Sequence, residues 1–460
     1  MPELQLPAAM SALRSDLGVI VEGVEAHASY GAVLLSAQQG LQIQIDDREE
    51  RVIESPPSAG TVVTAFDGVT LHERAIGGFD RSAVERGARD LVRDLTLVDQ
   101  ASIDPGPDRR GDFSTPISVL STAEKLEHCR DLQQRLRRRD ARIVNARVRY
   151  LDATEYAVFR NRSADLAQSV QRLYLIAMVM VAGPDGVRYD VAAKHANGDW
   201  DALVFSDDEL QRLTDNAIAL TSAERIEPGE YTIITAPGVT GTICHESFGH
   251  GVETDMFLKE RARAAHYIDR VVAAPLVSIY DDPSLPDGFG FYFFDDEGML
   301  AGPTQIVESG IFRRGITDLY SAMARGLPRS ANGLRSDYSR KAYARMSNTF
   351  FASGTTPVTD LFAQVESGVY LEKWSSGMED PQGWGIQVTC HFGHEIKHGK
   401  VTSRMFAPIG ITGYVPDVLQ TVSAVGSDFA HDAGNCGKGH KELLSVGSGG
   451  PHLLLKARLG

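Results

Sequence analysis

The segment from Ala141 to Ala196 constrains the fold more than any other part of the chain. Apolar and polar residues alternate in ARIVNARVRYL and again in YAVFRN, and the apolar run LYLIAMVMVAG ends at a Gly-Pro-Asp-Gly turn before VRYDVAAKHA. A two-residue period with a short glycine turn indicates antiparallel strands, because successive side chains of a strand point to opposite faces. The sequence therefore predicts an antiparallel sheet in the first half of the chain.

Helical patterns flank these strands. Residues 81–98 have the apolar spacing of a helix, and residues 206–226 predict another. Ser121 and Glu124 resemble a capping box that opens a helix extending to about Arg138. Strands are also expected at residues 30–37 and 41–47. A sheet with covering helices is an α+β pattern, which is the fold class that we predict.

The polar turn Glu227-Pro228-Gly229-Glu230 marks a change in organisation. From Tyr231 onward the pattern is rich in strands and punctuated by glycine and proline, and only residues 246–266 and 318–325 look helical. A chain of 460 residues is long enough for two domains. We predict an N-terminal α+β domain of residues 1–225 and a C-terminal, mainly β domain of residues 226–460.

Charge and composition limit the classes of partner. The chain carries 46 Lys and Arg against 61 Asp and Glu, a formal charge of −15, which repels nucleic-acid phosphates and anionic lipid headgroups. The start lacks the pattern of a secretory signal, and the longest apolar run is about half the length of a membrane helix. These features predict a soluble, cytoplasmic protein with no direct nucleic-acid contact and no membrane attachment. In that compartment the four cysteines are expected to be reduced.

The most informative motif is CHESFGHG, which contains His245, Glu246 and His250. Two imidazoles can hold a zinc ion, and a glutamate beside the first of them can take a proton from a metal-bound water. The histidines are five residues apart, which places them roughly 140° apart around a regular helix, on different faces. The sequence therefore predicts a local distortion of the helix around Gly249 that brings His250 back toward His245. A straight helix through this segment would contradict the metal site.

A third ligand is expected from elsewhere in the chain. Cys436 lies in GNCGKG, where glycines on both sides allow a sharp turn that presents a thiolate. A zinc ion at this sulfur would keep it deprotonated near neutral pH. The competing interpretations are a chance HExxxH match for the histidines and a small buried apolar residue for Cys436.

Three other candidates are not taken as metal sites. His394 to His398 spells HExxH, but it lies in GWGIQVTCHFGHEIKHGK, whose two-residue period predicts a strand and a hairpin turn. HExxH needs both histidines on one face of a helix. Cys244 is expected in the core. The acidic cluster Asp295, Asp296 and Glu297 is predicted to be a turn with solvated carboxylates rather than a site for a hard cation.

With these motifs in view, the sequence resembles the TldD/PmbA family of zinc metallopeptidases. The resemblance covers essentially all of the second half and only the general pattern of the first. It rests on CHESFGHGVETD, DDPSLPDGFGFYFFDDEG, NGLRSDYSRKAYARMSNTFFASG, the GKVT hairpin and VGSDFAHDAGNCGKG. Several motifs in the right order are far more specific than any one of them.

The resemblance implies a C-terminal β-rich domain that carries Zn²⁺ on the HExxxH helix, and cleavage of small unfolded peptides or peptide tails. It also implies that the substrate lies as an extended strand against a sheet edge. The expected assembly is a homodimer, or a heterodimer with a TldE-like homologue that lacks the metal motif. Because the chain has both histidines, Glu246 and Cys436, it resembles the metal-bearing member.

These observations combine into one hypothesis. Zn²⁺ is held by His245, His250 and Cys436, and Glu246 accepts a proton from the attacking water and passes it to the leaving amine. Three residues are candidates for the side chain that stabilises the oxyanion, and spacing does not choose among Tyr338, Tyr343 and His391. One rival function is a non-catalytic peptide-binding or scaffold subunit with a structural metal. Another is a regulator of DNA topology, an older label of the family, which the net charge disfavours.

Overall fold

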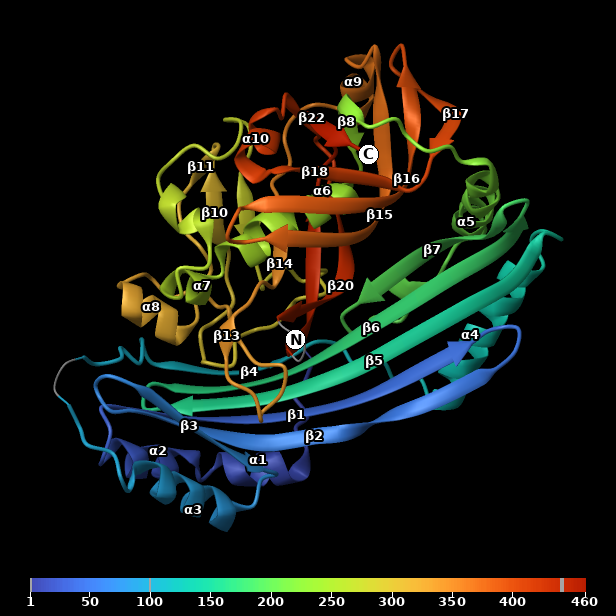
Figure 1. The fold of residues 1–460 in the computed structure, drawn as a ribbon. Coiled ribbons are helices and arrows are strands. Elements are labelled where there is room, and N and C mark those ends of the chain that lie inside the picture. The colour runs from blue at the N-terminus through green and yellow to red at the C-terminus, as the bar shows by residue number, and fades with distance from the viewer. Residues whose placement is uncertain (1, 99–100, 439–441) are drawn as a thin grey trace.

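The computed structural model describes residues 2–98, 101–438 and 442–460, and in Figure 1 the long sheet of the first half lies between its own helices and the second half of the chain. The first half forms a seven-stranded sheet in the order β3-β2-β1-β5-β6-β4, with β7 also paired to β6. All neighbours are antiparallel except β4 and β6. Its strands are β1 (Tyr30–Ile45), β2 (Glu50–Phe66), β3 (Leu71–Gly77), β4 (Arg109–Ser114), β5 (Ile143–Asn161), β6 (Ala164–Gly183) and β7 (Gly186–Ala196).

The predicted hairpin is confirmed, since β6 and β7 are joined at Gly183 and Gly186 by a two-residue turn. The two strands expected at residues 30–37 and 41–47 form one longer strand, β1, which crosses a register shift near Gly40 and ends at Ile45, two residues before the predicted end. The helices of this half are α1 (Ala8–Arg14), α2 (Leu17–Glu25), α3 (Arg81–Val92), α4 (Thr122–Arg137) and α5 (Asp207–Ala219). The capping box of Ser121 and Glu124 opens α4 as expected.

Two predicted helices are shorter than their sequence patterns. The helix expected at residues 81–98 ends at Val92, because Val98 instead donates its backbone N–H to the carbonyl of Asp67 in the β2–β3 turn. The helix expected at residues 206–226 ends at Ala219, and a single 3₁₀ turn, Leu220–Ser222, follows it. In both cases contacts with other parts of the chain stop a pattern that is locally helical.

The two faces of this sheet have different partners. Helices α1, α2 and α3 cover one face, and α4 and α5 lie toward one end of the long strands (Figure 1). The second half of the chain covers the other face. There Phe294 and Leu319 pack among sheet residues such as Leu34 and Phe159 in one buried apolar cluster. The halves are therefore joined through a hydrophobic contact as well as polar ones.

The second half is strand-rich, as predicted, and contains two further large sheets. In one, β15, β8, β22, β18 and β16 follow one another and β15 also pairs with β16, so the strands close into a small barrel that carries β17 and β19 at its rim. The other has the order β11-β10-β9-β14-β21-β20, and β12 pairs with β13. The bounds are β8 (Gly229–Thr235), β9 (Ile279–Asp281), β10 (Thr304–Glu308), β11 (Ile311–Phe312), β12 (Gly333–Leu334), β13 (Tyr343–Ala344), β14 (Asn348–Phe351), β15 (Ser367–Asp380), β16 (Gly385–Lys397), β17 (Lys400–Phe406), β18 (Ile409–Tyr414), β19 (Ala424–Val425), β20 (Ala430–Lys438), β21 (Glu442–Gly450) and β22 (Leu453–Leu459).

The expectation of only two helical segments in this half is wrong. The structure has α6 (Pro237–Cys244), α7 (Thr254–Leu258), α8 (Leu319–Arg325), α9 (Val358–Ala363) and α10 (Val415–Gln420). Helix α6 is buried and contacts β15 on one side and β14, β20 and β21 on the other. A Cβ at Gly241 would lie 2.6 Å from the backbone nitrogen of Gly449 on β21, so only glycine allows this close approach.

Among the described residues, no helix is both long enough and apolar enough to cross a membrane.

Candidate metal centre

The two histidines of the motif lie on a π-helical turn. Helix α6 continues without a break into the π-helix His245–Gly249, and a 3₁₀ turn, His250–Val252, follows. The backbone N–H of His250 bonds to the carbonyl of His245, five residues earlier, which is the hydrogen bond that defines a π-helix. The imidazole centroids are consequently only 5.1 Å apart. The predicted distortion is confirmed, and a straight helix through this segment is excluded.

A buried tryptophan supports this turn. The indole N–H of Trp384 donates to the carbonyl of Ser247 at 3.1 Å, which satisfies a carbonyl inside the distorted turn. The prediction of a continuous helix at residues 246–266 is wrong, because the backbone leaves the helical conformation within this segment. Glu253 is extended and Glu260 has a φ of 54°, so the segment is divided into the π turn, the 3₁₀ turn, α7 and a second 3₁₀ helix, Arg263–Tyr267.

Strand β20 brings Cys436 to the histidines. Its Sγ lies 2.7 Å from Nε2 of His250 and 3.3 Å from Nε2 of His245. Two ligands of a tetrahedral zinc ion are separated by about 3.5 Å, so this donor set fits zinc after a shift of less than an ångström. Burial would raise the pKa of the Cys436 thiol, but the hydrogen bonds and positive charges of His245 and His250 lower it to about 5. A thiolate and two imidazoles are a typical zinc donor set.

A second layer of charged residues surrounds the donors. Arg345, 1% exposed, donates to Sγ of Cys436 at 3.3 Å and to its carbonyl at 3.1 Å. The same arginine pairs with Glu253 at 3.2 Å, and Glu253 lies 3.8 Å from Nδ1 of His250. Although burial raises the pKa of Glu253, Lys438, His250 and Arg345 lower it to about 2. A carboxylate behind a ligating histidine fixes the orientation of its ring, as in many metal sites.

Glu246 faces the donor cluster from the same turn and is only 7% exposed. Burial raises the pKa of its carboxyl, His245 lowers it and a hydrogen bond with Glu379 raises it, to about 7. Strand β15 passes directly over this carboxylate: a Cβ at Gly377 would lie 2.3 Å from Oε1 of Glu246. Glycine at this position therefore leaves the space that the carboxylate occupies.

The rejected motifs lie where the sequence placed them, with one correction. His394 is on strand β16 and His398 is in the turn that follows, as predicted, and Cys244 is fully buried. All four cysteines are free thiols. The acidic cluster at residues 295–297 is not a freely solvated turn, however, because Asp295 is buried and Asp296 and Glu297 are only partly exposed. Its carboxylates accept backbone N–H groups of other loops, such as Gly333 and Leu319, so it holds those loops together.

Two of the three candidates for oxyanion stabilisation lie away from the donor cluster. Tyr338 packs against Gly60 of the first sheet, and His391 binds the carbonyl of Tyr189, so both belong to the contact between the halves. The Tyr343 ring lies 5.3 Å from Nζ of Lys438. Sequence reasoning missed Arg345, Glu253, Gly377 and Glu379. The pattern of the sequence gives no signal for them, because their proximity to the cluster arises only from the packing of distant segments.

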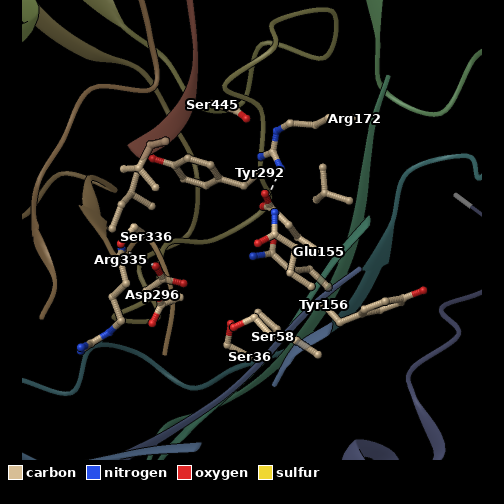
Figure 2. Close-up of a pocket in the computed structure, with 18 of the residues that line it drawn as sticks. Ser36, Ser58, Glu155, Tyr156, Arg172, Tyr292, Asp296, Arg335, Ser336 and Ser445 are labelled. Atoms are coloured by element: carbon tan, nitrogen blue, oxygen red, sulfur yellow. Dashed lines mark hydrogen bonds and ion pairs between the residues drawn. The ribbon is translucent and has the colours of Figure 1, made fainter. Parts of the chain in front are cut away.

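A separate cavity of about 330 Å³ lies between the first sheet and the second half (Figure 2). Glu155 and Arg172 line it from the sheet, joined by an ion pair of 2.5 Å, and Asp296 lines it from the second half. Asn435 also lines this cavity, whereas its neighbour Cys436 on β20 points to the opposite face of the strand, toward the histidines. Strand β20 therefore separates the cavity from the metal centre.

Known proteins provide an independent comparison. Residues 228–458 match the PmbA/TldA metallopeptidase C-terminal domain. The chain is 30% identical over 346 residues to a metalloprotease of Methanothermobacter thermautotrophicus, with 75% of each chain covered. It is 25% identical over 468 residues to a metalloprotease of Synechocystis sp., covering 97% of this chain and 98% of the relative.

Solved structures share the fold. A Thermotoga maritima protein described as a modulator of DNA gyrase superposes with a TM-score of 0.80 at 16% identity, covering 98% of this chain and 100% of that one. TldE from Thermococcus kodakarensis superposes with a TM-score of 0.72 at 15% identity, covering 98% and 100%.

The matches in sequence define the class first: the protein is a hydrolytic enzyme, a metallopeptidase. Within that class, the chain belongs to the TldD/PmbA family. The fold agrees, because the mixed α and β architecture with a β-rich second half is that of the superposed structures.

Proposed function

We propose that this metallopeptidase uses zinc, held by His245, His250 and Cys436, to hydrolyse small unfolded peptides or peptide tails. One observation carries the proposal: the thiol of Cys436, whose pKa is low, lies in contact with the imidazoles of His245 and His250. The buried Glu246 lies beside them. When bound, zinc lowers the pKa of a coordinated water and polarises the amide carbonyl. We assign the chemistry to the predicted C-terminal domain, residues 226–460.

The protein's own residues supply the proton transfers in this proposal. Glu246, with a pKa of about 7, is suited to accept a proton from the attacking water and to return it to the leaving amine. Arg345 and Glu253 hold the thiolate and the His250 ring in place, so they act as positioning residues. The backbone of β15 above Glu246 limits the movement of its carboxylate.

The assembly and the substrate belong to the same proposal. We expect an extended peptide against a sheet edge, a cytoplasmic location, and either a homodimer or a heterodimer with a TldE-like homologue. The superposition with TldE is consistent with such a pair at the level of fold. A non-catalytic subunit with a structural metal is the alternative, but a structural site has no use for a buried glutamate beside the first ligand.

Metal removal tests the proposal directly. Elemental analysis of the purified protein should find about one zinc ion per chain, as expected for one three-ligand site. Dialysis against 1,10-phenanthroline should abolish cleavage of an unfolded peptide, and added zinc should restore it. Cleavage that survives complete removal of the metal would refute a metal-dependent mechanism.

A change at Gly377 tests the placement of Glu246. We expect Gly377→Ala to displace the carboxylate, and thus to lower kcat by about 10²-fold while zinc content stays the same. Gly385→Ala, on the paired strand β16, is the matched control, because a Cβ there would lie no nearer than 3.9 Å to any atom, the nearest being the carbonyl oxygen of Gly413. Equal activity of the two variants, measured on one peptide, would show that Glu246 does not depend on the room left by Gly377.

A further inference from the structure

A second carboxylate, Glu379, enters the metal centre from strand β15. Ligand oxygens of Glu379 and Glu246 and a ring nitrogen of His250 all lie within 4.8 Å of one another. Glu379 is partly exposed, whereas Glu246 is buried, so Glu379 forms the more accessible side of this group. The proposed hydrolysis needs only one of the two carboxylates as a base, and it leaves Glu379 without a role.

The positive charges of the centre are engaged elsewhere. Arg345 pairs with Glu253, and Lys438 pairs with both Glu253 and Asp255. Within residues 2–98, 101–438 and 442–460, no lysine or arginine forms an ion pair with Glu246 or Glu379. Among the described residues, therefore, no basic side chain pairs with the carboxylates next to the histidines, and these carboxylates favour a cation supplied by the substrate.

Because every unblocked peptide has a cation at its N-terminus, we infer that Glu379 binds the substrate's α-ammonium group and that the enzyme releases residues one at a time from free N-termini. This inference rests on the proposed function and names its substrate class. The carbonyl carbon of a first residue lies about 2.5 Å from its own α-nitrogen. An ammonium hydrogen-bonded to Glu379 therefore places the first peptide bond within reach of a water held by Glu246, given the separation of at most 4.8 Å between the carboxylates.

The bonds formed and broken are those of any amide hydrolysis. Water adds to the carbonyl carbon of the first residue, the C–N bond breaks, and the proton taken by Glu246 goes to the new amine of the shortened peptide. Glu379 takes no part in this proton transfer, because its role is to accept hydrogen bonds from the ammonium. A substrate without that ammonium leaves the Glu379 carboxylate unpaired, so it is bound more weakly.

The test compares two peptides of one sequence without lysine or arginine, one with a free and one with an acetylated N-terminus. With the zinc-loaded full chain, mass spectrometry should show single residues lost from the free peptide, and a kcat/KM about 10- to 100-fold lower for the acetylated one. Glu379→Gln should raise KM for the free peptide by a similar factor with zinc content unchanged, and should leave the acetylated peptide unaffected. Glu372→Gln, seven positions earlier on β15 and paired with His394, is the matched control that keeps the preference.

Binding gives a readout that does not depend on turnover. In a Glu246→Gln background, fluorescence anisotropy should show the free peptide bound about tenfold more tightly than the acetylated one, a preference that Glu379→Gln removes. If the wild-type enzyme cleaves neither peptide but the preference in binding persists, the proposed hydrolysis fails and the role of Glu379 stands. If cleavage occurs equally on both peptides, or first yields internal fragments, the role of Glu379 is refuted and the hydrolysis stands.

Two further results would overturn the inference. About two zinc ions per chain, or zinc lost in Glu379→Gln, would make Glu379 a metal ligand, in a second group with Glu246 and His250. An acetylated peptide that begins with lysine distinguishes a side-chain ammonium from the α-ammonium. If this acetylated peptide is cleaved as fast as the free peptide, Glu379 binds the ammonium of the lysine side chain instead.

Discussion

Glu246→Gln is expected to keep zinc bound and the protein folded while it lowers kcat for peptide cleavage by about 10³-fold or more. Glutamine has nearly the same shape as glutamate, so it fits under Gly377 and preserves the packing around the buried side chain. It cannot accept a proton from water at neutral pH. The loss should therefore appear in kcat, with little change in the affinity for peptide.

The measurement pairs steady-state kinetics with elemental analysis and thermal unfolding of the same preparation. Unchanged zinc content and Tm would locate the defect in proton transfer rather than in the metal or the fold. Glu372→Gln again serves as the control, because it makes the same chemical change on strand β15 outside the cluster. A Glu246→Gln enzyme that retains normal turnover would exclude this residue as the base.

The candidate metal donors could be predicted from the sequence because the pattern that marks each of them is local. His245 and His250 share one turn, and their spacing predicted a distortion that the π-helix provides. Glycines on both sides of Cys436 likewise drew attention to it. The position of β20 relative to α6 brings Cys436 to the two histidines, and no local pattern of the sequence predicts that position.

Other features required the folded chain. Helix α6 was not among the predicted helices, since Gly238 and Gly241 discourage a helix, yet Gly241 allows α6 to approach the backbone of β21 closely. Strand β2 escaped notice because Pro56 and Pro57 lie within it, next to the register shift opposite β1.

Charge is the property that sequence reasoning judged least well. The acidic run at residues 295–297 looked like a solvated turn, but burial raises the pKa of Asp296 to about 7 and that of Glu297 to about 8. Arg345 was given no role from the sequence, yet it is almost fully buried against Cys436. Exposure decides the role of a charged residue, and exposure depends on tertiary packing.

Cys436→Ala is the second change with a large expected effect. The thiolate is one of three protein ligands in the proposed site, and zinc held by two imidazoles alone should bind at least about 10²-fold more weakly. The contrast with another buried cysteine supports this role. Burial raises the pKa of Cys390 to about 12, whereas the two histidines lower that of Cys436 to about 5, so among these two thiols only Cys436 is prepared to bind a metal as thiolate.

Cys390→Ala is therefore the matched control, since it also removes a fully buried thiol from the second half. Competition with a chromogenic zinc chelator should show weaker zinc binding in Cys436→Ala and unchanged binding in Cys390→Ala. Peptide cleavage should follow the zinc content and recover in Cys436→Ala only when zinc is in large excess. If both variants bind zinc as tightly as the wild type, Cys436 is not a ligand. The low pKa of its thiol would then reflect only the hydrogen bonds from His245 and His250.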